Sequence, residues 1–364
     1  MNKFYIIIII VCLFACKNKE PKLDIPSYKV MSNLKKKEKL SNYIDSVQYI
    51  PLETNINSLI GSISRIAVTP DRIFVGDRVA NCVLVFDRQG KYINKINHQG
   101  RGPEEYLRLY DFDVVEKDSL IYFYVGNKFQ VYDYAGEYKQ TIHIQEQTFS
   151  PLTIATNTDE IYLYMNYNVC NNKEAFNTVF INKQGKIKQR LFSYSKKIAG
   201  QINYSPRLYF RYYNNILLHF NNFENIIYER INGKSKPIFS LDFSQYKLPK
   251  ISEDNIIHLQ QTRFHGYALL YNIACVNNKY YALFMIDGSR YMSIISLRDH
   301  SISTINISED LEYDKSLTDL FLDYVCIEDN NFITYYDWSD DPELFSKLNL
   351  PEDSNPIIVF YHIK

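Results

Sequence analysis

The sequence predicts an all-β protein folded as a six-bladed β-propeller, and three observations lead to this prediction. First, an apolar strand and a polar turn ending in Gly recur at Gly90, Gly136, Gly185 and Gly233, a spacing of 46, 49 and 48 residues. Second, strand-like segments follow one another through most of the chain. Third, the last group of strands is one strand short, and a spare strand precedes the first group. A period of this length, built of strands, is typical of radial arrays of four-stranded blades.

Aromatic and β-branched runs mark the strands of six blades, because such side chains fit a pleated, half-buried surface. Blade one is the clearest, with strands predicted at 63–68, 72–75, 82–86 and 92–96. Residues 121–125 are apolar on both faces, as expected when sheets stack on sheets. The six blades cover residues 59–97, 110–144, 152–192, 208–243, 271–307 and 322–362.

The sixth blade has predicted strands only at 322–327, 332–336 and 357–362. Residues 43–52 are strand-like and lie before blade one. We expect them to form the outer strand of blade six, because this closure joins the two ends of the fold and removes an open sheet edge. Packing of the same strand elsewhere is the alternative.

Two segments interrupt the strand pattern. Residues 252–263 begin with Ser and two acids and continue with mixed apolar residues, which predicts a short capped helix between blades four and five. Residues 337–356 form a long polar loop that contains Trp338, with a helical turn predicted at 342–348.

The N-terminal residues predict export. Residues 1–15 have a basic start and an apolar run too short to span a bilayer stably, which is typical of a signal peptide. Leu13-Phe14-Ala15-Cys16 is similar to a bacterial lipobox, which predicts lipidation of Cys16 and attachment to the outer membrane, facing the periplasm or the cell surface. An ordinary secretory signal with a stray cysteine is the alternative. Residues 16–42 are Lys-rich and predict a flexible tether before the propeller at 43–364.

Composition excludes some functions and leaves others open. The chain has 41 basic and 41 acidic residues, so no basic excess favours nucleic acid as a partner. The 32 Tyr and 22 Phe are explained by packing, or in part by a face that binds a carbohydrate-like ligand. The remaining cysteines have no metal-ligand spacing and are expected to be small buried hydrophobic residues; they are Cys82, Cys170, Cys275 and Cys326.

Three phrases resemble the bacterial six-bladed β-propeller lipoproteins of the NHL/TolB-like kind. Residues 100–106 are close to that family's G-x-G-P-x-E-Y stretch. Residues 241–249 match its D-F-G-x-Y-x-L-P pattern with Ser244 in place of Gly, and residues 353–358 match its D-D-N-P ending with Ser354 in place of the second Asp. The resemblance implies the fold and an envelope location, and it implies no catalytic residues.

Candidate ligand-binding residues lie at connections between blades. Arg101, Glu105 and Tyr106 belong to the loop between blades one and two, which would lie on the ligand-bearing face or act as a rigid clasp between blades. Other basic and aromatic residues near inter-blade loops suit an acidic sugar or a peptide, and we expect them on the same face: Arg207, Arg211, Arg263, His265 and Trp338. Scattered surface charge would explain this second set equally well.

An alternative site would lie in the central channel. Alignment of the inner strands places one residue of each blade in a ring, namely Ser64, Asp111, Leu152, Tyr209, Asn272 and Asp323. Asp111, Asn272 and Asp323 carry oxygen ligands of the kind that Ca²⁺ accepts. The same residues suit a water-filled channel, and a shift of one residue in the alignment would turn every side chain to the other face.

The leading functional hypothesis is a non-catalytic binding or assembly module, without a cofactor, for a glycan, a peptide or an envelope protein. The alternative is a metal-dependent hydrolase or lyase with Ca²⁺ in the central channel. A structural component of an envelope complex, with no small ligand, is a third hypothesis. No G-x-S-x-G phrase and no convincing Ser/His/Asp set is present in the sequence.

Overall fold

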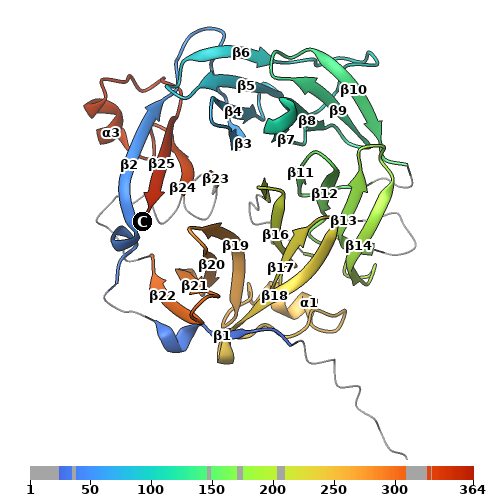
Figure 1. Cartoon of the computed structure of the whole chain (residues 1–364), viewed down its shortest axis with the longest axis vertical. Helices are drawn as coiled ribbons and strands as arrows, with labels where there is room; N and C mark the ends of the chain where they lie inside the picture. The colour runs from blue at the N-terminus through green and yellow to red at the C-terminus, as the bar shows by residue number, and fades with distance from the viewer. Residues whose placement is uncertain are drawn as a thin grey trace, which may run out of the picture.

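The architecture is a ring of six sheets. The computed structural model describes residues 24–34, 38–145, 149–169, 175–202, 210–308, 326–328 and 330–364. Five four-stranded sheets and one five-stranded sheet are present in these residues. The sheets radiate from a common centre, as Figure 1 shows. The six-bladed β-propeller predicted from the repeat is therefore confirmed.

Each blade consists of four antiparallel strands that run from the centre of the ring outward. The strands of blades one to three are β3 (Ile63–Val68), β4 (Arg72–Asp77), β5 (Cys82–Asp87) and β6 (Tyr92–Ile96), then β7 (Asp111–Val115), β8 (Leu120–Tyr124), β9 (Lys128–Asp133) and β10 (Tyr138–His143), then β11 (Thr153–Thr156), β12 (Glu160–Tyr164), β13 (Ala175–Asn182) and β14 (Ile187–Tyr194). Those of blades four to six are β15 (Tyr212–Tyr213), β16 (Ile216–Phe220), β17 (Ile226–Ile231) and β18 (Lys234–Asp242), then β19 (Ala268–Val276), β20 (Lys279–Ile286), β21 (Ser289–Ser296) and β22 (Ser301–Asn306), then β23 (Cys326–Glu328), β24 (Asn331–Tyr336), β25 (Ile357–Ile363) and β2 (Ile44–Pro51).

The ring is closed by the N-terminal strand, as expected. β2 pairs antiparallel with β25 from Ile44 opposite Ile363 to Pro51 opposite Ile357. Beyond the strand, the amide of Leu52 donates to the carbonyl of Pro356 at 3.2 Å. The outer strand of blade six therefore comes from the opposite end of the chain, and Pro51 is tolerated because it lies at the end of an edge strand.

Part of the expected tether packs against the propeller instead of extending from it. β1 (Ser27–Lys29) adds to the outer edge of blade four, parallel to β18, and Leu34 forms a bridge with Thr304 on the outer strand of blade five. Tyr28 and Val30 are 5% and 0% exposed. The expectation of a flexible tether is thus corrected for residues 24–34, because the free hydrogen-bonding edges of two outer strands accept an extra chain. Residues 16–23, with Cys16, lie outside the described residues.

Neighbouring blades bury aromatic side chains between them. Tyr132, Tyr162 and Tyr281 are at most 1% exposed. The ring of Phe123 lies 5.1 Å from that of Tyr132 in an edge-on arrangement, a geometry that aromatic pairs favour. Packing therefore accounts for much of the high aromatic content.

The recurring glycine has a structural role between blades. In blades one and three it ends the turn before the outer strand with φ of +84° and +76°, and its carbonyl oxygen accepts from the preceding blade. The amide of Glu53 donates to Gly90 at 2.8 Å, and that of Gln145 donates to Gly185 at 3.1 Å. In blade two the His98 ring takes the same place, 2.8 Å from the Gly136 oxygen. The repeated phrase thus joins each of these turns to the preceding blade.

Substitution Gly185→Ala is expected to destabilise the fold more than Gly233→Ala. A Cβ at Gly185 would lie 1.8 Å from the carbonyl oxygen of His143, whereas a Cβ at Gly233 would meet nothing within 4 Å. Both positions have a positive φ, so both variants carry the same backbone strain, and only Gly185→Ala must displace a backbone group. We expect a further loss of about 1–3 kcal/mol for Gly185→Ala in urea denaturation. Equal losses in the two variants would contradict the inter-blade role.

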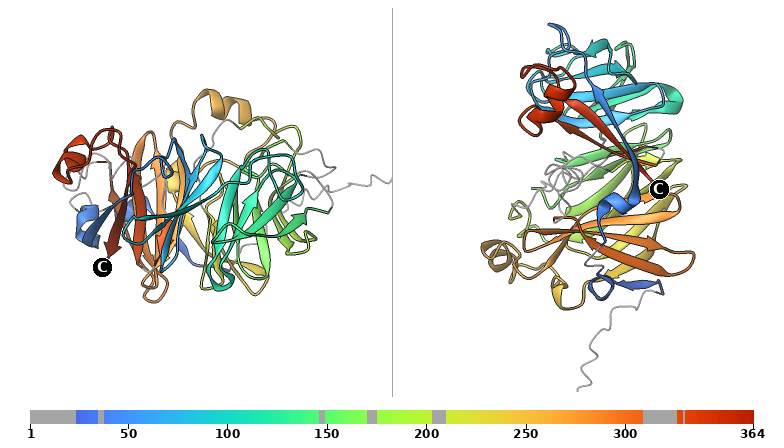
Figure 2. Two further views of the ribbon diagram at one scale, coloured as in Figure 1. Left: turned by 90° about the horizontal axis from the view of Figure 1, so that it is seen from above. Right: turned by 90° about the vertical axis from the view of Figure 1, so that its left-hand side faces the viewer.

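The connections between strands alternate between two rims of the ring. The rim that carries the loops into each blade and the loops between second and third strands is called the inter-blade rim. The opposite rim, called the hairpin rim, carries the turns between first and second strands. The helices α1 (Ile256–Gln261) and α3 (Pro342–Lys347) both belong to the inter-blade rim and project from the same side of the ring in Figure 2.

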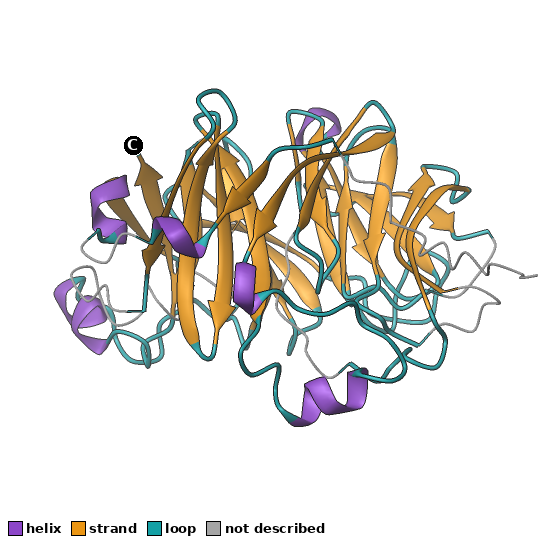
Figure 3. Cartoon of the chain, turned by 90° about the horizontal axis from the view of Figure 1, so that it is seen from below, coloured by secondary structure: helices purple, strands orange, loops and turns teal. Residues whose placement is uncertain are grey.

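Both helices fall within segments that interrupted the strand pattern. α3 begins with Pro342, and the Asp341 side chain accepts from the Leu344 amide at 2.9 Å, a favourable helix start. Figure 3 shows that helices contribute little to the molecule beside the strands. The 3₁₀ turns are equally short: η1 (Met31–Asn33), η2 (Leu40–Tyr43), η3 (Glu116–Asp118) and η4 (Ser244–Tyr246). None of the described helices is long and apolar enough to cross a bilayer.

Candidate functional site

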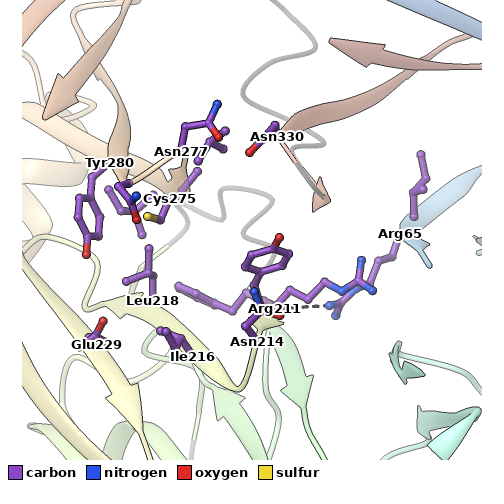
Figure 4. Close-up of a pocket in the computed structure, with 17 residues that line it drawn as sticks. Arg65, Arg211, Asn214, Ile216, Leu218, Glu229, Cys275, Asn277, Tyr280 and Asn330 are labelled. Carbon is purple, nitrogen blue, oxygen red and sulfur yellow. Dashed lines mark hydrogen bonds between the residues drawn. The ribbon is translucent and has the colours of Figure 1, made fainter. Parts of the chain in front are cut away.

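A cavity of about 540 Å³ opens at the hairpin rim, between the centre of the ring and blades four and five. Its walls come from β16, β17, β19 and β20, and its inner end reaches Arg65 on β3 (Figure 4). Asn330, from the first turn of blade six, lies at its side. A volume of this size is in the range of small-molecule binding sites, about 300–1,000 Å³.

The cavity exists because blade four has a short inner strand. β15 has two residues, whereas the inner strand of blade five, β19, has nine. Ile216 and Leu218 of β16 therefore lie on the cavity wall. Polar groups at the mouth come from two tight turns, Asn214-Asn215 and Asn277-Asn278, in which all four residues have φ between 48° and 62°. Asparagine tolerates this left-handed conformation, which two-residue hairpin turns require.

The deep wall of the cavity is largely apolar, with a few polar groups. Ile273, Val276 and Leu218 supply apolar surface, and Tyr280 presents a half-buried ring. Burial, and secondarily the charge of Glu229, raise the pKa of the Cys275 thiol. The thiol therefore stays protonated and is a poor nucleophile. Glu229 itself pairs with Lys236 at 3.2 Å.

Arg65 occupies the centre of the ring and joins four blades. Its guanidinium lies 3.0 Å from Asp111 and 3.3 Å from Asp113 of blade two. It also donates to the carbonyl oxygens of Ile154 in blade three, at 2.9 Å, and Phe210, which precedes the inner strand of blade four, at 3.1 Å. Because Arg65 is 2% exposed, these partners replace most of its hydration. Arg65 is a central structural contact that also forms the inner end of the cavity.

The sequence alignment missed Arg65 because β3 is irregular. The register between β3 and β4 shifts between Ile63 and Arg65, and such a bulge turns the following side chains. Arg65 therefore reaches Asp111, where the alignment had placed Ser64. An arginine within an otherwise apolar inner strand was the available signal.

The structure does not assemble the oxygen ring considered as a calcium site. The Oδ2 atom of Asp111 accepts from the Ile154 amide at 2.8 Å and from Thr153 at 3.1 Å, in addition to its ion pair with Arg65. Asn272 accepts from the amide of Ile273 through its side-chain oxygen. Asp323 lies outside the described residues, and within those residues no group of three or more His, Cys, Asp or Glu could hold a metal ion.

The loop of Arg101, Glu105 and Tyr106 has the geometry of a clasp. Tyr106 is 2% exposed, and its hydroxyl donates to the carbonyl of Asn81 at 2.9 Å. The Glu105 carboxylate accepts from the amide of Gly102 at 2.6 Å within the same loop. Arg101 is exposed, so it is the member of this set whose side chain is presented to solvent.

The predicted ligand residues do not all share one rim. Arg101, Arg263, His265 and Trp338 lie in connections of the inter-blade rim. Arg211 instead lies at the cavity on the hairpin rim, where its guanidinium donates to the Val68 carbonyl at 2.5 Å. The common-face expectation is therefore wrong for Arg211, because the inner strand that follows it is too short to separate it from that rim. Arg207 lies outside the described residues.

The members on the inter-blade rim have different surroundings. His265 lies 2.9 Å from Asp287, and both side chains are exposed. Trp338 packs against the hydrophobic core between blades five and six. Arg263 is exposed beside α1. No ligand role follows from these contacts, and for these residues it stays a prediction.

Lys183 is a further unusual group that the sequence did not reveal. Its Nζ atom donates to Thr156 at 2.5 Å and lies 3.7 Å from the centroid of the Tyr122 ring. Burial lowers the pKa of Lys183 to about 7, although nearby carboxylates, of which Asp113 contributes most, act in the opposite direction. The lysine joins blades two and three and does not line the cavity.

Comparisons with known proteins agree with this fold. A family model described as "Domain of unknown function (DUF4934)" matches residues 24–362. A candidate exported protein of Bacteroides fragilis has a solved structure that matches with a TM-score of 0.67 and 15% identity, over 93% of this chain and 99% of that one. A DUF4221 family member of Bacteroides vulgatus matches with a TM-score of 0.58 and 12% identity, over 88% and 97%. No curated protein has a matching sequence. Since the family model spans nearly the whole propeller, the chain belongs to the DUF4934 family.

Proposed function

We propose that this protein is a binding module that holds a small polar ligand, a glycan or a peptide, in the cavity at the hairpin rim. The observation that carries the proposal is the chemistry of the cavity. Its apolar deep wall and the Tyr280 ring suit the faces of a sugar or an apolar side chain. Its mouth carries the Asn214, Asn277 and Asn278 amides, each of which offers hydrogen-bond donors and an acceptor to hydroxyl or peptide groups.

The cavity can be tested by filling it. Cys275 lines the cavity and is partly exposed, so Cys275→Phe should occupy the ligand space, whereas Cys275→Ser keeps the size of the side chain. The probes are arrays of neutral and acidic oligosaccharides and of short peptides, with hits measured by calorimetry. We expect Cys275→Phe to weaken binding at least tenfold, about 1.4 kcal/mol, and Cys275→Ser to bind as the parent does. Equal binding by both variants at equal melting temperature would refute the cavity as the site.

The proposed location is the outer membrane, through lipidated Cys16. The signal-like residues 1–15 and the lipobox support it, and the likeness to a candidate exported protein agrees with export. The finer likeness to NHL/TolB-like lipoproteins remains part of this proposal.

Substitution Cys16→Ala is expected to move the protein from the membrane fraction to the soluble fraction, because the acyl chains bind the membrane through their buried methylene groups. Labelled fatty acid should enter the parent and not the variant. A parent protein that never takes up the label would end the lipid-anchor proposal.

A further inference from the structure

Exposed apolar side chains are concentrated on one rim of the propeller. Among the described residues, ten large hydrophobic side chains are exposed, and eight of these belong to the inter-blade rim. Single exposed hydrophobic residues are ordinary, but chance placement would divide them between the rims. Five of the eight lie on three neighbouring loops of blades six, one and two: Ile56, Leu59, Val79, Leu107 and Tyr110, which are 84%, 49%, 73%, 67% and 54% exposed.

The three loops touch one another. A Cβ at Gly61 would lie 2.8 Å from the Cβ of Val79, so the loop into blade one contacts the loop between its second and third strands. The side chain of Asn81 donates to the carbonyl of Leu107 at 3.2 Å and accepts from the amide of Leu109 at 2.7 Å. The apolar residues therefore share one continuous surface across two blade boundaries.

Buried groups hold these loops in place. The Asp77 carboxylate is 2% exposed and accepts from the amides of Gly61, Val79 and Ala80 at 2.8–3.1 Å. The buried ring of Tyr106 fixes the third loop through its hydroxyl. A surface built in advance loses less conformational entropy on binding than a flexible one.

Three arginines flank the apolar residues. Arg78, Arg101 and Arg108 are exposed on the same loops. Arg78 donates to Ser62 at 2.9 Å, and the Arg108 guanidinium lies 5.1 Å from the Tyr110 ring centroid. The acids of the last two loops are mostly turned inward, since Asp77 and Glu105 accept from backbone amides and Glu104 alone is exposed. The exposed charge is therefore predominantly positive.

We infer that these loops form an arginine-flanked apolar surface that docks a protein partner, through a segment with apolar side chains between carboxylates. Arginine and tyrosine are enriched in protein interfaces, whereas lysine is depleted, and the three loops contain no lysine. Guanidinium groups also fit carboxylates in a bidentate manner. This inference is independent of the cavity, which opens on the opposite rim.

The test uses synthetic peptides in fluorescence anisotropy with the full propeller. One set has a Leu, Phe or Trp centre flanked by Glu and Asp, and a matched set has the same centre flanked by Lys. We expect saturable binding of the acidic set, at least tenfold tighter than the Lys set. Arg101→Glu and Leu107→Ser should each weaken this binding at least tenfold, while the exposed control Ile257→Ser and the cavity variant Cys275→Phe should leave it unchanged.

Three results would overturn the inference. They are equal binding of the two peptide sets, failure of both to bind, and binding that Arg101→Glu does not weaken. Vesicles of phosphatidylcholine and phosphatidylglycerol separate a membrane from a protein partner. If the vesicles bind through Arg101 and the peptides do not, the surface contacts lipid and the proposed protein partner is wrong.

Discussion

A protein shortened to begin at Thr54 is expected not to fold cooperatively, because the truncation removes β2 from blade six. Ile44, Ile50 and Leu52 are at most 4% exposed. Loss of a buried aliphatic side chain costs about 2–5 kcal/mol, so these residues alone rival a typical free energy of unfolding of about 5–15 kcal/mol. The truncation would also expose the edge of β25, an apolar strand with Ile357, Ile358 and Val359 fully buried, to pairing with other molecules.

Two further truncations serve as controls. The reference protein begins at Asp24 and keeps β1 and β2. A protein that begins at Ser41 loses the chain along blades four and five, with the buried Tyr28 and Val30, but keeps the strand that closes the ring. We expect it to fold with a lower melting temperature, and we expect the protein that begins at Thr54 to aggregate in size-exclusion chromatography. A protein without β2 that melts as the reference does would show that closure contributes little.

Substitution Arg65→Met is expected to destabilise the propeller by about 3–5 kcal/mol, because removal of one member of a buried ion pair leaves the other uncompensated. The residue that suffers most is Asp113, which is 0% exposed. Asp111 keeps its contacts with Thr153 and Ile154. The carbonyl oxygens of Ile154 and Phe210 also lose a donor.

Urea denaturation of the variant measures this loss, with Arg101→Met as the matched control. Arg101 is exposed, so its replacement should change the free energy of unfolding by no more than about 0.5 kcal/mol. The double variant Arg65→Met, Asp113→Asn removes the uncompensated charge and should recover part of the loss. Equal stability of Arg65→Met and Arg101→Met would show that the central network contributes nothing to stability.

The fold was predictable from the sequence because a propeller repeats one local solution. The glycine that ends each turn is required by a positive φ, and at Gly90 and Gly185 also by a close approach of the preceding blade. Both requirements act within a few residues and leave a visible pattern. The missing strand of blade six and the strand before blade one were equally visible, since an open edge in a ring must be filled.

The candidate site was less predictable, because it depends on irregularities that interrupt the repeat. The bulge in β3 moved Arg65 into the place expected for Ser64. The two-residue strand β15 brought Arg211 to the cavity. Neither departure changes the apolar pattern enough to be recognised in a single sequence.

The sequence by itself determined the six blades, the strand that closes them and the helices at the inter-blade rim, since periodicity and turn chemistry are local properties of the chain. Only the tertiary structure decided that residues 24–34 lie along the outer strands, that one arginine joins four blades and that the cavity lies opposite the predicted face. These features depend on contacts between segments far apart in the chain, such as Arg65 with Phe210. The physical reason is that burial and pairing of such groups are set by the closed ring, and no single segment encodes them.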